Sequence, residues 1–193
     1  MKVILASLSP RRKELMNLII GGFDIEAADI DERAIEESLT GTDPVKVSEA
    51  LALEKALVIA KAHPDDVVIG ADTSVIANGK ILGKPRDREE AKEMLTELSG
   101  IEHVVATGVA VIQGEKIISF TEETKVKFWD LDPYMEQKIE EYIDSDDPYD
   151  KAGGYGIQTK GALLVEKIDG DYLNVVGLPV ARLARVLSEM GVG

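Results

Sequence analysis

Near its start the chain reads Val3-Ile4-Leu5-Ala6-Ser7-Leu8-Ser9-Pro10-Arg11-Arg12, and this stretch predicts a strand that runs directly into a helix. Residues 3–6 form a short apolar run with β-branched side chains, long enough for a buried strand. Ser9 offers an N-cap hydroxyl, and Pro10 fits the first helical position. The pattern predicts a helix from residue 10 to about residue 20, ended by Gly21-Gly22.

Two serines and two arginines surround the expected start of this helix. The backbone N–H groups at a helix N-terminus attract anions, and arginine matches phosphate oxygens through paired hydrogen bonds. Ser7, Ser9, Arg11 and Arg12 therefore suggest a phosphate site. From these residues alone, the alternative is a strand, a turn and a helix whose arginines are simply solvated.

The length and charge of the chain limit the classes of protein to consider. With 193 residues, 45% of them apolar, we expect one α/β domain over residues 1–193, with room for two lobes. The net charge of −14 argues against a general nucleic-acid surface. An anionic ligand would need a local cluster of cations, with metal ions as a further source of positive charge.

Several common kinds of site are missing from the sequence. There is no cysteine, which excludes disulfides, thiol nucleophiles and cysteine-based zinc sites. His63 and His103 have no third ligand at metal-site spacing, and no nucleophile elbow is present. Without a signal-peptide pattern or a long apolar span, we expect a cytoplasmic protein that does not bind membranes.

Lys55 lies inside a helix predicted over residues 44–62, with Asp43 as its N-cap. Its helical neighbours at three and four residues are all apolar: Leu51, Ala52, Val58 and Ile59. Lys55 therefore either extends along these side chains to solvent or points into a site that needs a fixed cation. The acidic segment of residues 29–32 has two interpretations as well, a solvated loop or ligands for a hard divalent cation.

Asp72 follows a second buried-type strand, residues 67–71. Ligands in open α/β sheets gather at the carboxyl ends of such strands, which places Asp72 well for chemistry. Asn78-Gly79 then predicts a hairpin that would carry Lys84 back toward the end of the same strand. We expect Asp72 and Lys84 to be neighbours, either in a surface ion pair of little energetic value or in a site.

The rest of the chain predicts further elements. Helices are expected over residues 87–98, 133–143 and 179–190, strands over 104–112 and 116–128, and a hairpin of residues 162–168 and 171–176 around Asp169-Gly170. Between them lies the glycine-rich stretch of residues 151–158. Its three glycines in four positions allow either a close backbone approach to a ligand or a tight turn.

Taken together, these stretches resemble the Maf family of nucleoside triphosphate pyrophosphatases. The resemblance covers nearly the whole chain and runs through residues 4–7, 9–12, Glu32, 55–56, 70–73, 81–85, 98–100, His103, 107–109, 151–158 and 174–179. Each fragment is short, but their order and spacing are specific. Leu8 departs from the first motif, where a small or polar residue is more usual.

The resemblance implies a two-lobed mixed twisted sheet flanked by helices, similar to inosine triphosphate pyrophosphatases, with a cleft between the lobes. It implies hydrolysis of a nucleoside triphosphate to the monophosphate and pyrophosphate with Mg²⁺ or Mn²⁺, for nucleotide-pool house-cleaning, in a homodimer. The form of residues 155–158 resembles the branch acting on dTTP and UTP, and modified pyrimidine nucleotides are a further candidate. The matching positions are Ser7, Arg11, Arg12, Glu32, Lys55, Asp72, Thr73, Lys84 and Gln158.

The resemblance also suggests a role for each of these residues. Asp72 and Glu32 would hold the metal ion, and Asp72 would orient or deprotonate the attacking water. The side chains that would neutralise the phosphates and the departing pyrophosphate are Arg11, Arg12, Lys55 and Lys84. Ser7 would contact phosphate, and Gln158 could read the base edge through its donor and acceptor atoms. Arg11 and Thr73 match positions linked to base choice.

Two other classes of function stay open at this point. A nucleotidyltransferase also holds a nucleotide on a first-strand loop with an arginine, but that loop is normally glycine-rich, unlike residues 8–10 here. A nucleotide-binding regulator of cell division or septum formation, without turnover, is the second alternative. Hydrolysis of a triphosphate without an acceptor molecule would favour the pyrophosphatase over both.

Overall fold

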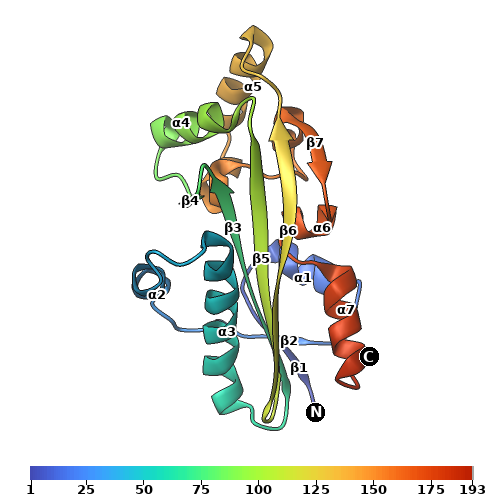
Figure 1. Cartoon of the computed structure of the whole chain (residues 1–193). Coiled ribbons are helices and arrows are strands. Elements are labelled where there is room, and N and C mark those ends of the chain that lie inside the picture. The colour runs from blue at the N-terminus through green and yellow to red at the C-terminus, as the bar shows by residue number, and fades with distance from the viewer. Residues whose placement is uncertain (193) are drawn as a thin grey trace. The chain divides into compact units, whose positions relative to one another are not determined.

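The computed structural model describes residues 1–192 and has a mixed sheet flanked by helices (Figure 1). Within these residues the sheet has seven strands in the order β2-β1-β3-β5-β6-β7, and β4 pairs with β3. The strands are β1 Val3–Ala6, β2 Asp24–Ile25, β3 Val67–Ala77, β4 Lys80–Leu82, β5 Glu102–Gln113, β6 Lys116–Phe128 and β7 Val165–Asp169. Pairing is parallel for β1 with β2 and β3, and antiparallel for β3 with β4 and β6 with β7. The expected mixed α/β class is confirmed.

The chain forms two compact units. Unit 1 comprises residues 1–73 and 107–122 and the described residues from Gly177 onward, and unit 2 comprises residues 74–106 and 123–176. The long strands β3, β5 and β6 each contribute residues to both units. The expectations of a single domain over residues 1–193 and of a cleft between lobes stay predictions.

Unit 1 has helices on both faces of its strands. Figure 1 shows α3 (Pro44–Ala62) on one side and α1 (Pro10–Met16) and α7 (Val180–Glu189) on the other. The core on the α3 side is formed by small and branched side chains: Ile4, Ala6, Ala56, Ile59, Val68, Ala110 and Ile112. Between β2 and α3 lies a short helix, α2 (Glu32–Ser38), which was not predicted and which begins at the last residue of the acidic segment 29–32. Its N-cap is Asp31, whose carboxylate accepts from the Ala34 N–H at 3.0 Å.

The first helix starts where the sequence predicts and ends earlier. The Ser9 hydroxyl accepts from the Arg12 N–H at 3.5 Å, as expected of an N-cap. The helix ends at Met16 rather than near residue 20, because the following N–H groups of Leu18 and Ile19 bond to carbonyls three residues back. The Asn17 side-chain amide donates to the Lys13 carbonyl at 2.9 Å and satisfies one of the terminal acceptors.

Two glycines let α3 approach the sheet closely. A Cβ on Gly70 of β3 would lie 2.1 Å from the Ala52 carbonyl oxygen, and one on Gly108 of β5 would lie 2.2 Å from the Glu49 backbone nitrogen. The Glu49 carboxylate also accepts hydrogen bonds from Ser119 and Thr121 of β6, at 2.8 and 2.7 Å. These contacts hold α3 in place against β3, β5 and β6. They therefore also set the distance between Lys55 and β3.

Unit 2 has its own core between its strands and two adjacent helices, α4 (Arg88–Leu98) and α5 (Pro133–Ile143). Both helices were predicted, and their caps, Asp87 and Asp132, accept backbone N–H groups at 2.9 and 2.7 Å. The largest fully buried side chains of this core include Tyr142, Phe128 and Leu95.

Two strand predictions are wrong. The expected break after residue 71 does not occur, because β3 continues through Asp72 and Thr73 into the hairpin with β4, which itself is confirmed. The expected hairpin around Asp169-Gly170 is also absent from the described residues. There, β7 pairs with β6, and residues Tyr172–Val176 form the short helix α6. The Asp171 carboxylate accepts from the Leu173 N–H at 2.8 Å, which favours a helical turn over a second strand.

Within residues 1–192, none of the helices combines the length and the apolar character needed to cross a bilayer.

Candidate active site

Lys55 lies between two carboxylates in unit 1. Its ammonium nitrogen is 2.7 Å from an oxygen of Asp72 on β3 and 2.7 Å from an oxygen of Glu32 at the start of α2. The side chains of Lys55 and Asp72 are only 11% and 16% exposed, whereas that of Glu32 is 53% exposed. Lys55 therefore points inward rather than along its apolar neighbours to solvent, and its role in a site stays a prediction. Elements from three parts of the chain thus bring one cation and two anions together.

Arg12 organises the loop after β1. Its guanidinium directs four N–H groups at protein acceptors, namely the Ser7 hydroxyl at 3.2 Å, the Ala71 carbonyl at 2.9 Å, the Thr73 hydroxyl at 2.9 Å and the Gly177 carbonyl at 2.9 Å. Because the guanidinium is planar and has five donors in a fixed fork, these bonds set its orientation. Burial lowers the pKa of Arg12, an effect that the nearby Asp72 carboxylate opposes, so the two side chains share one electrostatic environment.

The two hydroxyls that accept from Arg12 lie in different elements, Ser7 after β1 and Thr73 in β3. Ser7 Oγ also accepts from the Ser9 N–H at 3.3 Å, and Thr73 Oγ1 lies 2.9 Å from the Thr107 hydroxyl of β5. The hydrogen bonds of Arg12 thus connect the end of β1, the middle of β3 and the segment before α7. Its predicted role as a phosphate ligand stays a prediction, and the structure adds an organising role that the sequence did not reveal.

Glu36 is a further acidic group near this cluster that sequence reasoning missed. Burial, and then the negative charges of Asp72 and Glu32, raise its pKa. Glu36 lies four residues after Glu32 on α2, so the two side chains share a helix face. The i, i+4 spacing could have indicated it, but only if residues 32–38 had been predicted as a helix.

The donor set around Lys55 fits a hard divalent cation. Carboxylate oxygens are what Mg²⁺ and Mn²⁺ prefer, and Mg²⁺ is usually held by one or two carboxylates together with substrate phosphates. Asp72 and Glu32 supply two such groups. Among residues 1–192, no group of three or more histidine, cysteine or acidic side chains is arranged to hold a metal ion by itself. The remaining ligands would therefore have to be water or phosphate oxygens.

The other two predicted residues, Lys84 and Gln158, belong to unit 2 and have exposed side chains. Their segments touch: the Gly153 N–H donates to the Gly83 carbonyl at 3.0 Å, and a Cβ on Gly154 would lie 3.4 Å from Pro85. Gly153 and Gly154 have φ values of +71° and +72°, a conformation that favours glycine. The glycine-rich stretch is therefore a tight turn packed beside Lys84. The expected neighbourhood of Asp72 and Lys84 stays a prediction.

This chain matches the model of one protein family, described as Maf-like protein, over residues 2–190. It belongs to the Maf family. Relatives named dTTP/UTP pyrophosphatase are found in Bacillus cytotoxicus, with 48% identity over 100% of this chain and 97% of the relative, and in Bacillus mycoides, with 49% identity over 97% and 95%. Among solved structures, a HAM1 protein from Coxiella burnetii aligns over 98% of this chain and 99% of its own, with 13% identity and a TM-score of 0.49.

The Maf resemblance drawn from the sequence motifs is thus confirmed. Of the predicted site residues, the structure of this Maf protein brings Ser7, Arg12 and Thr73 into one hydrogen-bonded group and Glu32, Lys55 and Asp72 into another. Arg11 is half-buried on α1, beside Arg12. The functional roles of all of them stay predictions.

Proposed function

We propose that this protein hydrolyses nucleoside triphosphates, with dTTP and UTP as its preferred substrates, to the monophosphate and pyrophosphate. The observation that carries the proposal is the Lys55 ammonium, nearly buried between the Asp72 and Glu32 carboxylates. Such an arrangement of fixed charges suits a reaction in which charge must be neutralised around phosphate. The names of the relatives support the same substrates for this chain.

In this proposal Asp72 is the residue that acts on the attacking water. Its carboxylate is held at a fixed position by Lys55 and by its place inside β3, so it can orient the water or accept its proton. Glu32 is more exposed and lies at the start of a short helix. A divalent cation, Mg²⁺ or Mn²⁺, held by these two carboxylates would supply positive charge toward the phosphate oxygens.

The cations of the site have the task of binding the phosphates. Lys55 can exchange one of its carboxylate contacts for a phosphate oxygen, because an ammonium group has three donors. Arg11 and the Ser7 hydroxyl would bind phosphate at the N-terminus of α1, and Arg12 would hold that loop in shape. Lys84 would neutralise charge on the departing pyrophosphate, and Thr73 and Gln158 would take part in base choice.

We propose further that the protein works in the cytoplasm, as a homodimer, on free nucleotides rather than on nucleic acid. The net charge of −14 supports the last point, because a nucleic-acid surface requires a broad excess of lysine and arginine.

A panel of natural and modified nucleoside triphosphates, incubated with Mg²⁺ or Mn²⁺ and no acceptor, tests the proposal by pyrophosphate release. We expect dTTP and UTP to be turned over fastest and chelation of the metal to stop turnover. Binding without turnover would favour the regulator, and turnover only with an acceptor molecule would favour the nucleotidyltransferase.

Asp72→Asn should lower kcat by at least a factor of about 100, because the amide cannot accept the proton of water. The fold should stay intact. Asp65→Asn, an exposed carboxylate in the turn before β3, is the matched control and should leave kcat unchanged. A variant at Asp72 with near-native kcat would remove this residue from the mechanism.

A further inference from the structure

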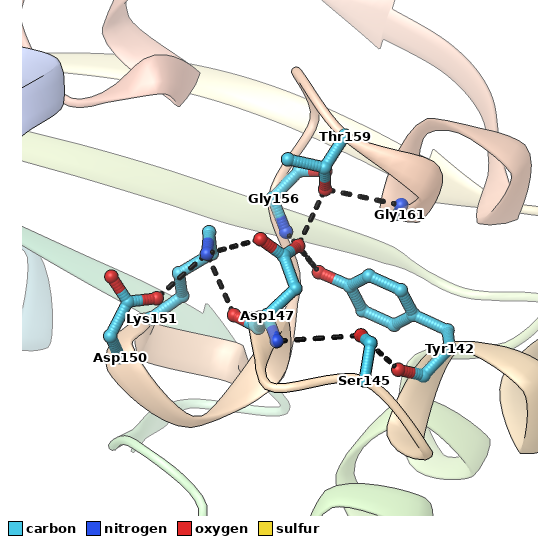
Figure 2. Close-up of polar contacts among 8 residues, drawn as sticks. All are labelled: Tyr142, Ser145, Asp147, Asp150, Lys151, Gly156, Thr159 and Gly161. Carbon is cyan, nitrogen blue, oxygen red and sulfur yellow. Dashed lines mark hydrogen bonds and ion pairs between the residues drawn. The ribbon is translucent and has the colours of Figure 1, made fainter.

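One half-buried carboxylate, that of Asp147, holds both ends of the segment that carries Gln158 (Figure 2). On the N-terminal side, its backbone carbonyl and one carboxylate oxygen accept from the Lys151 ammonium at 2.7 and 2.9 Å. On the C-terminal side, its second carboxylate oxygen accepts from the Thr159 hydroxyl at 2.6 Å. Residues 151 and 159 are thus attached to the same side chain.

Tyr142 of α5 connects the middle of this segment to Asp147. Its phenolic hydroxyl accepts from the Gly156 N–H at 2.9 Å and donates to the same Asp147 oxygen that Thr159 reaches (Figure 2). Tyr142 is 2% exposed and belongs to the unit 2 core, so this contact is fixed by packing. Burial and the hydrogen bond with Asp147 raise the pKa of Tyr142, so the hydroxyl keeps its proton.

Gln158 lies in the turn of residues 156–159, whose other residues are held by hydrogen bonds or by burial. The Thr159 N–H donates to the Gly156 carbonyl at 3.3 Å and closes the turn, with Ile157 and Gln158 at its centre. Ile157 is 8% exposed, whereas the side chain of Gln158 is in solvent. The Thr159 hydroxyl accepts from the Gly161 N–H at 3.4 Å and begins the next helical turn. The backbone of Gln158 is therefore fixed from both sides while its amide stays available.

The network is charged, and its cation is buried while its central carboxylate is half-buried. Lys151 is 8% exposed and also meets the Asp150 carboxylate at 2.7 Å. Its aliphatic part passes where a Cβ on Gly156 would be, 2.6 Å from the Lys151 Cε. Burial alone would raise the pKa of Asp147, but hydrogen bonds from Thr159, Tyr142 and Lys151 outweigh it and lower the pKa below its usual value. Asp147 is thus ionised at neutral pH and can serve as the common acceptor.

We propose that Asp147, Tyr142, Lys151 and Thr159 are positioning residues that fix the Gln158 turn and thereby set the selectivity of the enzyme for its base. The proposal rests on the function proposed above. An amide can distinguish the oxygen at position 4 of uracil from the amino group of cytosine only if its donor and acceptor atoms are held in place. A turn fixed by four partners holds the backbone from which this amide projects and so limits the positions that the amide can reach, whereas a glutamine on a free loop would lack that limit.

The test compares the kcat/KM values for UTP and CTP, which differ only at that edge of the base. Thr159→Val removes the hydroxyl with little change in volume, and Thr159→Ser restores it. We expect the UTP/CTP ratio to fall roughly tenfold in Thr159→Val, through KM for UTP with little change in kcat, and to return to within twofold in Thr159→Ser.

Tyr142→Phe is a second variant with a matched control. It removes the acceptor of the Gly156 N–H, whereas Tyr149→Phe removes a hydroxyl that donates to the Ile143 carbonyl at 2.8 Å and does not touch the turn. The first should lower the UTP/CTP ratio and the second should not. Thermal melting of each variant ensures that only folded enzyme is compared.

A double-mutant cycle with Gln158→Ala separates positioning from general stability. If the network acts through Gln158, Thr159→Val should have no further effect on the ratio in the Gln158→Ala background. Unchanged ratios in both Thr159→Val and Tyr142→Phe, or full additivity with Gln158→Ala, would overturn the inference. Failure of the proposed function would look different, since the wild-type protein itself would then release no pyrophosphate.

Discussion

Arg12 directs four of its five N–H donors at acceptors within unit 1, and two of these are main-chain carbonyls. An arginine held in this way contributes to folding as well as to any ligand. Arg33 on α2 carries the same charge on a side chain that is 87% exposed, which makes it a suitable comparison.

Replacing Arg12 by lysine should therefore lower the free energy of unfolding by about 2–3 kcal/mol, because an ammonium cannot reach all four acceptors and leaves carbonyls unsatisfied. Urea unfolding followed by circular dichroism measures the change. Arg33→Lys should change stability by much less, because a surface ion pair such as that of Arg33 with Glu37 contributes little. If the two substitutions have equal effects on stability, Arg12 does not organise the loop as described.

His103 lies in the unit 2 core, against the rings of Phe128 and Tyr155 at centroid distances of 5.1 and 5.5 Å. Its Nε2 is 2.7 Å from the Tyr155 hydroxyl, and burial lowers the pKa of the imidazole from 6.5 to about 4. At neutral pH the ring is uncharged in both the folded and the unfolded chain. Between pH 6.5 and 4 only the unfolded chain takes up the proton, so stability falls as the pH falls.

We expect this single group to remove about 3 kcal/mol of stability between pH 7 and 4, since each pKa unit corresponds to 1.36 kcal/mol. The measurement is urea unfolding at several pH values for the wild type and for His103→Gln, which has no such proton. The carboxylates titrate in both proteins, so the difference between the two curves isolates His103. Parallel curves would contradict the burial of this ring.

At the scale of elements, the placement of α3 determines the candidate site. At Gly70 and Gly108 the backbone of this helix lies directly against the sheet, because a Cβ on either residue would overlap it, and at this distance Lys55 reaches Asp72. The helix itself, with its Asp43 cap, was predicted from the sequence. Its contact partners were not, because periodicity identifies a buried face without identifying what covers it.

Gly108→Ala should destabilise the protein by about 3 kcal/mol, because the new methyl group would overlap the backbone of Ser48 and Glu49. It should also reduce turnover, since α3 carries Lys55. Gly21→Ala is the control: no atom lies within 4 Å of its added Cβ, and its effect on stability should be within about 0.5 kcal/mol. Denaturant midpoints and pyrophosphate release give the two readouts, and equal midpoints would show that the helix can move away at little cost.

Local signals explain which elements were predictable. Asp43 and Asp87 each precede a helix and accept a backbone N–H there, as the sequence indicated, and Asp132 does the same at α5. The helix α2 was missed because its segment has few apolar residues in a helical period. The break predicted after residue 71 was wrong because polar residues at 72–74 interrupt the apolar run without interrupting the strand's pairing.

At the scale of the whole molecule, 36 acidic residues outnumber 22 basic ones. Most surface ion pairs here contribute little to stability, but the net charge sets long-range interactions. The protein should leave the fluorescence anisotropy of a labelled DNA oligonucleotide unchanged at 0.15 M salt and micromolar concentration, because its net charge of −14 opposes binding to a polyanion. Binding tighter than about 1 μM would contradict the proposed preference for free nucleotides.

For the candidate site, the sequence predicted which residues to consider, and their roles stay predictions, but it did not predict the hydrogen bonds among them. The order of the motifs indicated candidate site residues such as Ser7, Arg12 and Asp72. Nothing in the sequence indicated that Arg12 would bind carbonyls of distant segments. Glu36 was missed because residues 32–38 were not predicted as a helix, and the contacts of Asp147 were missed because they depend on the conformation of an irregular segment. Hydrogen bonds between residues far apart in the chain depend on the packing of several elements at once, which a local pattern does not encode.

The shared attachment of residues 151–161 to Asp147 and Tyr142 has a consequence for engineering. Transplanting only the glycine-rich loop into another member of the family would leave its anchor behind on α5 and the segment that follows. A chimera intended to change nucleotide preference should therefore exchange residues 142–161 as one cassette.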